Sequence, residues 1–150
     1  MSTRDGLSVD EGIRTMLLLM PRLVGRAKRI PVPEQLRGLE LAPRHLSLLA
    51  YLLFDGPLAV GELASRLEVA PTTASLLVGE LSRKGVLERR EDDHDRRRTI
   101  VTIADASRAA VQAWLASSAT AWRTALEPLT AEQRGIVIRT LRVYEESVSE

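Results

Sequence analysis

The chain has 150 residues, of which 45% are hydrophobic and 27% charged, with a net charge of +1 and no cysteine. This length suits a single domain with its own core and is too short for two. The absence of cysteine excludes disulfides, zinc–thiolate sites and thiol-based redox sensing within the chain. The near-neutral charge neither requires nor excludes nucleic acid, so only the clustering of basic residues is informative.

The sequence carries no pattern of a membrane or exported protein. The longest apolar run, residues 16–20, is too short to cross a bilayer. Asp5, Asp10 and Glu11 precede it, where a signal peptide would be basic. We therefore expect a cytoplasmic protein.

The first predicted helix begins at Ser8, because Ser8 and Glu11 have the spacing of a capping box. Apolar residues then recur at helical spacing as far as Ala27 and form one stripe. Pro21 interrupts this stripe, and a proline inside a helix removes a hydrogen bond at a cost of about 3 kcal/mol. We expect a kink or two helical segments there, with residues 31–33 ending the element. The stripe consists of Ile13, Met16, Leu17, Met20, Leu23, Val24 and Ala27.

A second helix is expected from Pro43 to about Phe54, because proline suits the first helical position. The Asp-Gly-Pro sequence at residues 55–57 is a strong stop signal. The apolar residues expected on one side of this helix are Leu46, Leu49 and Leu53.

Two further helices are predicted close together, over residues 60–67 and from Pro71 to about Lys84, with Gly85 at the second C-cap. A separation of three or four residues is typical of a helix-turn-helix. The residues expected to face inward are Leu63, Ala64 and Leu67 in the first helix, and Ala74, Leu77, Val78 and Leu81 in the second.

Three hydroxyl residues, Thr72, Thr73 and Ser75, fall at the start of the second of these helices and away from its inward positions. Short hydroxyl side chains both donate and accept hydrogen bonds, which suits base edges and phosphates. The alternative interpretation is that they only help to start the helix.

After Gly85 the pattern changes to two strands, residues 86–90 and 99–103, joined by a charged tip. The segment from Arg83 to Arg98 holds seven basic and five acidic residues. This mixture predicts that some aspartates order the hairpin by pairing with arginines, which leaves other arginines for DNA. Such surface pairs contribute only about 0–1 kcal/mol, so their role is orientation. The alternative is a solvated charged loop.

In the C-terminal part of the chain we expect an alanine-rich helix over about residues 105–126, with Trp114 and Trp122 near one face. Thr130 and Gln133 have capping-box spacing before a last helix. Its four-three-four apolar pattern is typical of a helix pair, so we expect these helices and the first one to form a two-fold dimer. Intramolecular packing of the three helices is the alternative. The apolar pattern is formed by Val137, Leu141, Tyr144 and Val148.

The helix-turn-helix, the Gly-Val-Leu-Glu-Arg-Arg sequence at 85–90 and the Asp-Asp-His-Asp-Arg-Arg-Arg tip at 92–98 resemble the winged helix of the MarR family of bacterial transcriptional regulators. The resemblance extends along nearly the whole chain. It implies a mainly α fold with a small β-hairpin wing, in a single domain at 1–150. Within this domain, the resemblance implies dimerisation helices at 8–30 and 105–148 around a winged-helix DNA-binding region at 43–103.

The resemblance further implies a ligand-responsive homodimeric repressor that binds a roughly palindromic operator in double-stranded DNA. Each recognition helix would lie in a major groove and each wing would reach toward a minor groove. Candidate DNA contacts are Pro71, Thr72, Thr73 and Ser75 on the recognition helix, and Arg96, Arg97 and Arg98 on the wing tip. Arg83 and Arg90 are further candidates, because they are basic and lie nearby in the sequence.

Several positions depart from the family pattern. Leu76 stands where arginine is frequent, and Glu80 where a basic residue is frequent, so affinity should depend more on the wing. Glu68 occupies a turn position where glycine is common, and Ser107 also replaces a usual glycine. Ala59 replaces the N-cap hydroxyl, which should weaken that helix start by about 1 kcal/mol.

Nothing in the sequence indicates an enzyme, a metal site or a cofactor. His45 and His94 are the only histidines, and no nucleophile–base–acid set or phosphate loop is visible. His94 lies among aspartates that could hold a cation, but arginines crowd them and the spacing fits no ligand set. A winged-helix module that binds another protein, without DNA, is the alternative function.

Members of the resembled family often bind small aromatic or lipophilic acids between the dimer helices and the winged helix. Methionines and aromatic residues at helical spacing are also ordinary core residues, which is the alternative interpretation. The candidate effector-pocket residues are Arg14, Met20, His45, Tyr51 and Trp114, together with Met16.

Overall fold

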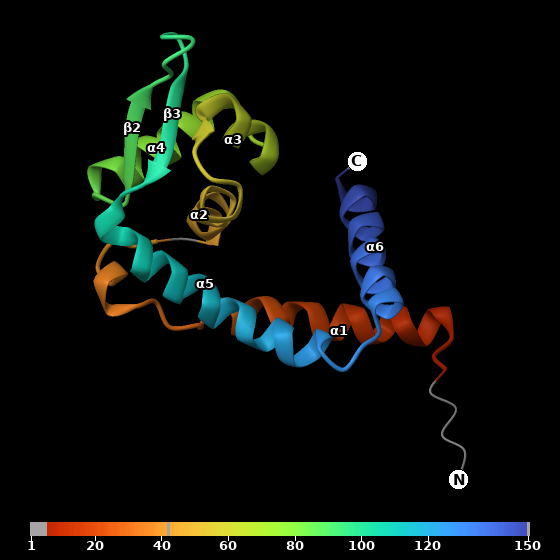
Figure 1. Ribbon diagram of the computed structural model, residues 1–150. Helices are drawn as coiled ribbons and strands as arrows, with labels where there is room; N and C mark the ends of the chain where they lie inside the picture. The colour runs from red at the N-terminus through yellow and green to blue at the C-terminus, as the bar shows by residue number, and fades with distance from the viewer. Residues whose placement is uncertain (1–5, 42, 150) are drawn as a thin grey trace.

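The computed structural model describes residues 6–41 and 43–149. Over these residues the chain forms six α-helices, one short 3-10 helix and a three-stranded antiparallel sheet. Figure 1 shows the sheet and helices α2 to α4 gathered in one part of the molecule, with α5 leading away from them toward α6. The predicted mainly α fold with a β-hairpin is confirmed.

Helix α1 (Val9–Ala27) begins with the predicted capping box. The Ser8 backbone N–H donates to Oε2 of Glu11 (2.9 Å), and the Glu11 backbone N–H donates to Oγ of Ser8 (3.2 Å). The helix continues through Pro21, so of the two predicted alternatives the division into two segments is wrong, and the kink stays a prediction. A proline removes only one helical hydrogen bond, and in an exposed helix water can satisfy the released carbonyl.

Helix α2 (Pro43–Asp55) follows a 3-10 turn at Glu34–Leu36 and has the predicted bounds. Its buried face differs from the predicted one. Leu49 is buried as expected, but Leu46 and Leu53 are only half-buried, because α2 contacts α3, β3 and α5 and so buries a wider arc. Gly56, with φ +80°, ends the helix in the left-handed region that glycine favours. The buried residues of α2 include His45, Leu48, Leu49 and Leu52.

The two helices of the predicted motif are α3 (Val60–Leu67) and α4 (Pro71–Arg83). Three residues separate them, as expected. Leu63 and Ala64 of α3 are buried and Leu67 is half-buried, which confirms the predicted inward face. Lys84 is the C-cap of α4, and Gly85 follows with φ +77°. All four predicted inward residues of α4 are buried: Ala74, Leu77, Val78 and Leu81.

The hairpin consists of β2 (Leu87–Glu91) and β3 (Thr99–Ile103), in which Arg89 pairs with Val101. A two-residue strand, β1 (Leu58–Ala59), pairs with the other edge of β3 and gives the order β1-β3-β2. This strand was not predicted, because two residues are too short to show an alternating pattern. It connects the start of α3 to the hairpin.

One apolar core holds these elements together. Leu49 of α2, Leu63 of α3, Leu81 of α4 and Ile103 of β3 belong to it. Trp114 completes the cluster from α5 (Asp105–Leu126) and is only 5% exposed. Burying a side chain of this size contributes several kcal/mol, so the core anchors α5 to the sheet and the motif.

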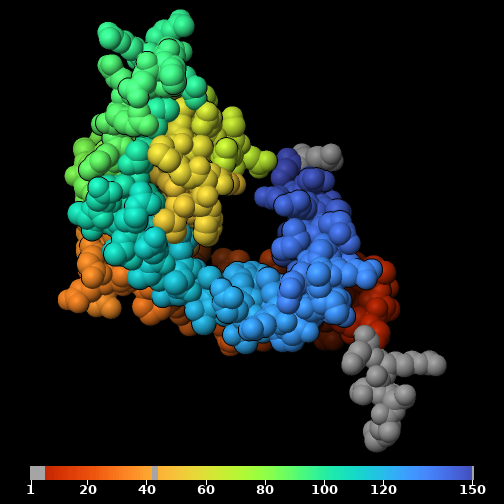
Figure 2. All heavy atoms as spheres, in the orientation of Figure 1, coloured from red at the N-terminus to blue at the C-terminus, as the bar shows by residue number. Residues whose placement is uncertain are grey.

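The two terminal helices are exposed in the single chain. No residue of α1 or of α6 (Ala131–Val148) is fully buried. Figure 2 shows open space between α6 and the part of the molecule that contains α2 and α3. Thr130 and Gln133 form the predicted capping box of α6. Large exposed apolar residues are Val9, Ile13, Met16, Leu17, Leu18, Leu23 and Val24 in α1, and Ile136, Ile138, Val143, Tyr144 and Val148 in α6.

The two tryptophans predicted to share one face of α5 differ in burial. Trp114 packs in the core, whereas Trp122, two turns later, is 56% exposed, because α5 has left the core by that point. In α6, Val137 and Leu141 are half-buried and Tyr144 is exposed. None of the described helices is long and apolar enough to span a membrane.

Candidate nucleic-acid interface

The turn between α3 and α4 sets the angle at which α4 leaves the core. Glu68 is the C-cap of α3 and has φ 55° and ψ 44°, the left-handed conformation that glycine usually provides. The Val69 backbone N–H donates to the Ala64 carbonyl (3.0 Å) and closes the turn. The sequence identified Glu68 as standing in place of a turn glycine, and its backbone has the corresponding conformation.

The outer face of α4 is polar at its N-terminal end. Thr72, Thr73 and Ser75 are exposed, as predicted. The N-cap is Ala70, which offers no side-chain acceptor, and Pro71 follows it at the first helical position. None of the three hydroxyls therefore occupies the N-cap position, where it would be held by the backbone.

Two aspartates shape the wing tip. Oδ1 of Asp92 accepts from the His94 backbone N–H, and Oδ1 of Asp95 accepts from the Arg97 backbone N–H, both at 3.1 Å. These are Asx turns, in which a short carboxylate replaces a backbone acceptor. The backbone N–H of Arg98 also donates to the Asp95 carbonyl (2.9 Å). The acidic residues therefore order the hairpin, as the charge pattern predicted.

The arginines of the tip have different surroundings. Nη2 of Arg98 lies 2.7 Å from Oε1 of Glu62 in α3, and its Nη1 lies 3.6 Å from Oδ2 of Asp92. Arg97 contacts Asp95 at 3.3 Å, yet its side chain is 93% exposed. Arg90 has only a long contact with Asp93, at 3.9 Å. Arg98 thus ties the wing to α3, whereas Arg97 projects from the tip.

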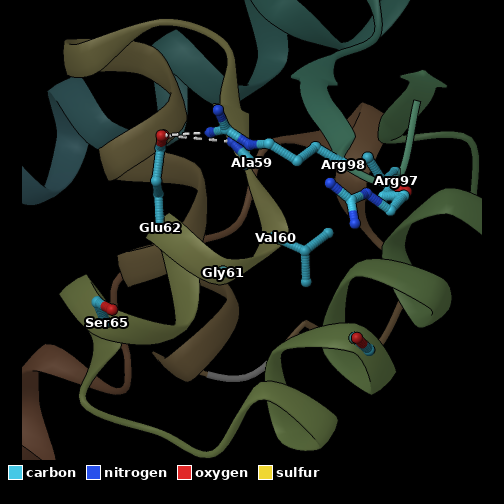
Figure 3. Close-up of a pocket in the computed structure, with 9 residues that line it drawn as sticks. Ala59, Val60, Gly61, Glu62, Ser65, Arg97 and Arg98 are labelled. Carbon is cyan, nitrogen blue, oxygen red and sulfur yellow. Dashed lines mark hydrogen bonds and ion pairs between the residues drawn. The ribbon is translucent and has the colours of Figure 1, made fainter. Parts of the chain in front are cut away.

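An open pocket of about 540 Å³ lies where α3, α4 and the wing meet (Figure 3). Glu62 reaches across it to Arg98, and Arg97 lies beside them. The pocket combines hydroxyls, backbone of a helix start and guanidinium groups, which are the usual partners of phosphate. Its lining residues are Ala59, Val60, Gly61, Glu62, Ser65, Ser75, Arg97, Arg98 and Thr99.

The start of α3 is capped in an unusual way. Ala59 cannot cap with its side chain, as the sequence indicated, but its backbone N–H donates to Oε2 of Glu62 (3.3 Å). Glu62 thus serves both this helix start and Arg98. The capping role of Glu62 can be predicted from the sequence, because a glutamate at the third helical position is typical of a capping box. The contact with Arg98, 36 positions away, has no sequence signal.

A second polar contact joins α2 to α4. Nε2 of His45, which is 3% exposed, donates to Oε2 of Glu80 (3.2 Å). This hydrogen bond from His45 lowers the pKa of Glu80 below its usual value, with smaller contributions from the charges of His45, Arg44 and Lys84, while burial opposes the shift. Glu80, expected to weaken DNA binding, is therefore partly engaged inside the motif.

The departure at Ser107 also has a structural role. Oγ of Ser107 donates to the Gly85 carbonyl (3.2 Å) and so joins the start of α5 to the turn before β2. Within the described ranges, no group of three histidine, aspartate or glutamate side chains is placed to hold a metal ion.

The five candidate effector-pocket residues are spread over several elements. His45 contacts α4, the Tyr51 hydroxyl donates to the Arg66 carbonyl (3.1 Å), and Trp114 belongs to the core. Arg14 and Met20 lie on α1. None of them lines the pocket at the wing or the open pocket of about 440 Å³ at the α5–α6 turn, beside Trp122 and Arg134.

Comparison with known proteins agrees with this geometry. Residues 38–98, which include the whole motif and the wing tip, match the model of the MarR family. The match confirms that the winged helix of this chain resembles that of the MarR family.

A curated MarR-family match gives the same assignment. The HTH-type transcriptional repressor MdtR of Bacillus subtilis (strain 168) is 34% identical over 76 residues. The match covers 49% of this chain and 49% of MdtR, so the chain aligns with about half the length of this relative. Its name is that of a regulator and not of an enzyme, in agreement with the sequence-based prediction.

Solved structures extend the similarity to nearly the whole chain at the level of fold. S. aureus MepR in its DNA-binding conformation matches with a TM-score of 0.68 at 20% identity, over 90% of this chain and 98% of MepR. The PcaV transcriptional regulator of Streptomyces coelicolor, in complex with its natural ligand, matches with a TM-score of 0.67 at 17% identity. That match covers 95% of this chain and 98% of PcaV. Both confirm the fold that the MarR resemblance implied.

Proposed function

We propose that this chain is a sequence-specific DNA-binding transcriptional regulator that acts as a homodimer. The observation that carries this proposal is that Ser75, at the exposed hydroxyl end of α4, and the wing residues Arg97 and Arg98 line one open pocket. A helix fits the major groove, which is about 12 Å wide, and a hairpin beside it can reach the next minor groove. MepR, of the same fold, has been solved as a complex with DNA, which supports this arrangement.

The roles of the contacts follow from their chemistry. Thr72 and Thr73 would face base edges, with Pro71 setting the start of the helix against the groove. Ser75 and the backbone at the start of α3 would receive a phosphate in the pocket, where Arg97 supplies positive charge. Phosphate contacts of this kind fix the register of the protein on DNA, while base contacts supply specificity.

The remaining basic residues add affinity. Arg96 is exposed at the wing tip, and Arg90 is exposed on β2. Arg83 is exposed in the last turn of α4. Each phosphate neutralised by such a residue releases counterions from DNA, so affinity should fall steeply as salt rises.

The exposed apolar faces of α1 and α6 support the homodimer. A row of leucines and valines at this exposure is uncommon on a soluble monomer and is typical of an interface. Segments 8–30 and 105–148 would pair across a two-fold axis, which is the commonest oligomer symmetry. Two recognition helices would then meet a roughly palindromic operator, with half-sites about one helical turn apart.

A small-molecule effector belongs to the same proposal. PcaV is solved with its natural ligand, and an aromatic or lipophilic acid would suit the apolar residues of α1, α2 and α5. The candidate contacts are Arg14 for the carboxylate, and Met20, His45, Tyr51 and Trp114 for the rest of the ligand. In the described part of the single chain they line neither of the two open pockets, so such a site would need the dimer or a rearrangement around α5. Repression is the direction that the name of MdtR supports.

A salt titration separates this proposal from a winged helix that binds only protein. DNA duplexes are selected from a random pool, and binding is followed by fluorescence anisotropy over a range of salt concentrations. The logarithm of affinity should fall linearly with the logarithm of salt, and Arg96→Ala and Arg97→Ala should each reduce the slope by about 1.

Arg29→Ala is the matched control, because Arg29 is exposed in the turn after α1 and away from the wing. It should leave the slope unchanged. If the selection enriches no sequence and binding does not respond to salt or to the wing variants, the DNA-binding proposal is wrong and the protein-binding module is the better function.

A further inference from the structure

The outer side of α4 carries an exposed leucine, Leu76, where a polar residue that reads DNA would be expected. Residues spaced by four, three and four positions follow one line along a helix. Thr72, Leu76, Gly79 and Arg83 have this spacing. Thr72, Leu76 and Arg83 are exposed on the side of α4 opposite Leu77 and Leu81, whereas Gly79 between them is buried. Leu76 is 66% exposed, so it contributes little to the core of its own chain.

Leu76 is flanked by polar residues. Thr72, Thr73 and Ser75 are exposed around it, and Glu80, one turn further, is held by His45. An isolated exposed leucine has no packing role in the folded chain, and it cannot donate or accept a hydrogen bond. Any favourable contact that Leu76 makes with a ligand is therefore with an apolar group of that ligand.

The major groove offers one such feature. The C5-methyl group of thymine is the apolar group on the base edges there, and aliphatic side chains recognise it by contact. We infer that Leu76 specifies a thymine in each half-site by burying its methyl group, an inference that rests on the proposed DNA-binding function.

The residues that follow Leu76 along α4 predict contact with a second base. A Cβ added at Gly79 would lie 3.4 Å from Nη1 of Arg83, so the guanidinium of Arg83 lies close to the buried Gly79. Glycine inside a helix is unfavourable by about 1 kcal/mol relative to alanine. Here its lack of a side chain leaves room for the guanidinium of Arg83, which remains exposed one turn after Gly79.

Arginine most often reads guanine, through O6 and N7. Leu76 and Gly79 are three residues apart, or about 4.5 Å along the helix axis. Successive bases on one strand rise by about 3.4 Å. This spacing therefore fits a thymine with a guanine one or two base pairs away.

Uracil substitution tests this inference directly, because it removes only the methyl group. Duplexes selected from a random pool by the wild-type protein are synthesised with each thymine replaced in turn by deoxyuridine. Affinities are measured by fluorescence anisotropy at one fixed salt concentration. One substitution per half-site should lower wild-type affinity by about fourfold, the change expected for one methyl-sized group.

The same scan is repeated with Leu76→Ala, and with Ser75→Ala as the matched control. Leu76→Ala should bind all duplexes more weakly and lose the response at that one thymine, whereas Ser75→Ala should keep it. A selection with Leu76→Arg should replace this thymine by guanine. Because Leu76 is exposed, neither substitution threatens the core.

Two outcomes overturn the inference, and they are distinguishable. If wild-type protein binds selected DNA with the expected salt dependence, but every deoxyuridine effect persists in Leu76→Ala, then Leu76 does not read thymine and the proposed function stands. If the selection enriches no DNA, the proposed function and this inference fail together.

Discussion

Nε2 of His45 in α2 and Oε2 of Glu80 in α4 form a hydrogen bond of 3.2 Å that joins the core helix to the recognition helix. His45 is buried, and the carboxylate of Glu80 remains partly exposed on α4. The contact draws the acidic group of the recognition helix toward α2. In the proposed complex it would limit repulsion between Glu80 and DNA phosphates.

The first prediction concerns the pKa of Glu80 in His45→Leu. The pKa should rise toward the usual glutamate value, because the hydrogen bond from His45 is the largest cause of its lowering. Carboxyl carbon NMR over a pH titration measures this change. Glu11 provides an internal control, because its pKa is lowered by the Ser8 backbone and side chain in α1 and should stay low in the variant.

The same contact predicts the direction of a stability change with pH. The folded-state pKa of Glu80 is depressed, so its contribution is present above the usual glutamate pKa of about 4.3 and is lost as pH falls through the lower folded value. Glu80→Gln should remove that part of the acid dependence in thermal unfolding. An unchanged Glu80 pKa in His45→Leu would contradict the assignment of this hydrogen bond as the cause.

The second prediction separates two neighbouring wing arginines. Arg98 contacts Glu62 and Asp92, so Arg98→Ala should loosen the wing and raise amide hydrogen exchange over residues 92–98. The effect on the free energy of unfolding should be no more than about 1 kcal/mol, because the pair is on the surface. Arg97→Ala should leave exchange unchanged, and instead reduce the salt slope of DNA binding by about 1.

Hydrogen–deuterium exchange by mass spectrometry, together with the salt titration, measures both effects. Glu62→Gln is the matched control, because it weakens the Arg98 contact without removing an arginine. It should reproduce the faster exchange of Arg98→Ala. Equal exchange in wild type and Arg98→Ala would show that Arg98 does not hold the wing.

The third prediction concerns the proposed dimer. Leu17 is 70% exposed on the predicted apolar stripe of α1. Leu17→Glu should dissociate the dimer, because burying an unpaired carboxylate in an apolar interface is strongly unfavourable. Light scattering during size-exclusion chromatography should then give the mass of one chain in place of two.

Thr15→Glu is the control for this prediction, because Thr15 is exposed on the side of α1 away from the stripe. It should leave the dimer intact. A wild-type protein with the mass of one chain at micromolar concentration would refute the homodimer, and a dimeric Leu17→Glu would move the interface away from this stripe.

The parts of the fold that the sequence predicted are those with local causes. Capping boxes at Ser8 and Thr130 and the glycine at 85 define helix ends through residues within a few positions of each other. The inward faces of α3 and α4 followed from helical spacing alone. The break considered at Pro21 does not occur, because one lost hydrogen bond does not end a long helix.

The parts that it did not predict depend on long-range contacts. Strand β1 exists because β3 lies beside it, and Arg98 meets Glu62 across 36 positions. His45 and Glu80 are 35 positions apart, so neither residue alone indicates their contact. At the candidate site, sequence reasoning found the exposed hydroxyls and arginines but not which arginine supports the wing.

The last prediction concerns backbone strain at Glu68. Its φ of 55° is the left-handed conformation, which costs a residue with a Cβ about 1–2 kcal/mol. Glu68→Gly should remove this strain, although glycine also adds freedom to the unfolded chain worth about 0.4–1 kcal/mol. We expect a net stabilisation of about 0.5–1 kcal/mol in urea unfolding, followed by the fluorescence of buried Trp114.

Glu68→Ala distinguishes strain from charge at this position. Alanine removes the carboxylate and keeps the Cβ, so it should not reproduce the gain. The turn geometry should be unchanged in Glu68→Gly, because the Val69 N–H still closes it onto the Ala64 carbonyl. DNA affinity should therefore stay the same while stability rises. Equal stability gains in the glycine and alanine variants would assign the effect to the charge, and a loss in Glu68→Gly would show that the turn is not strained.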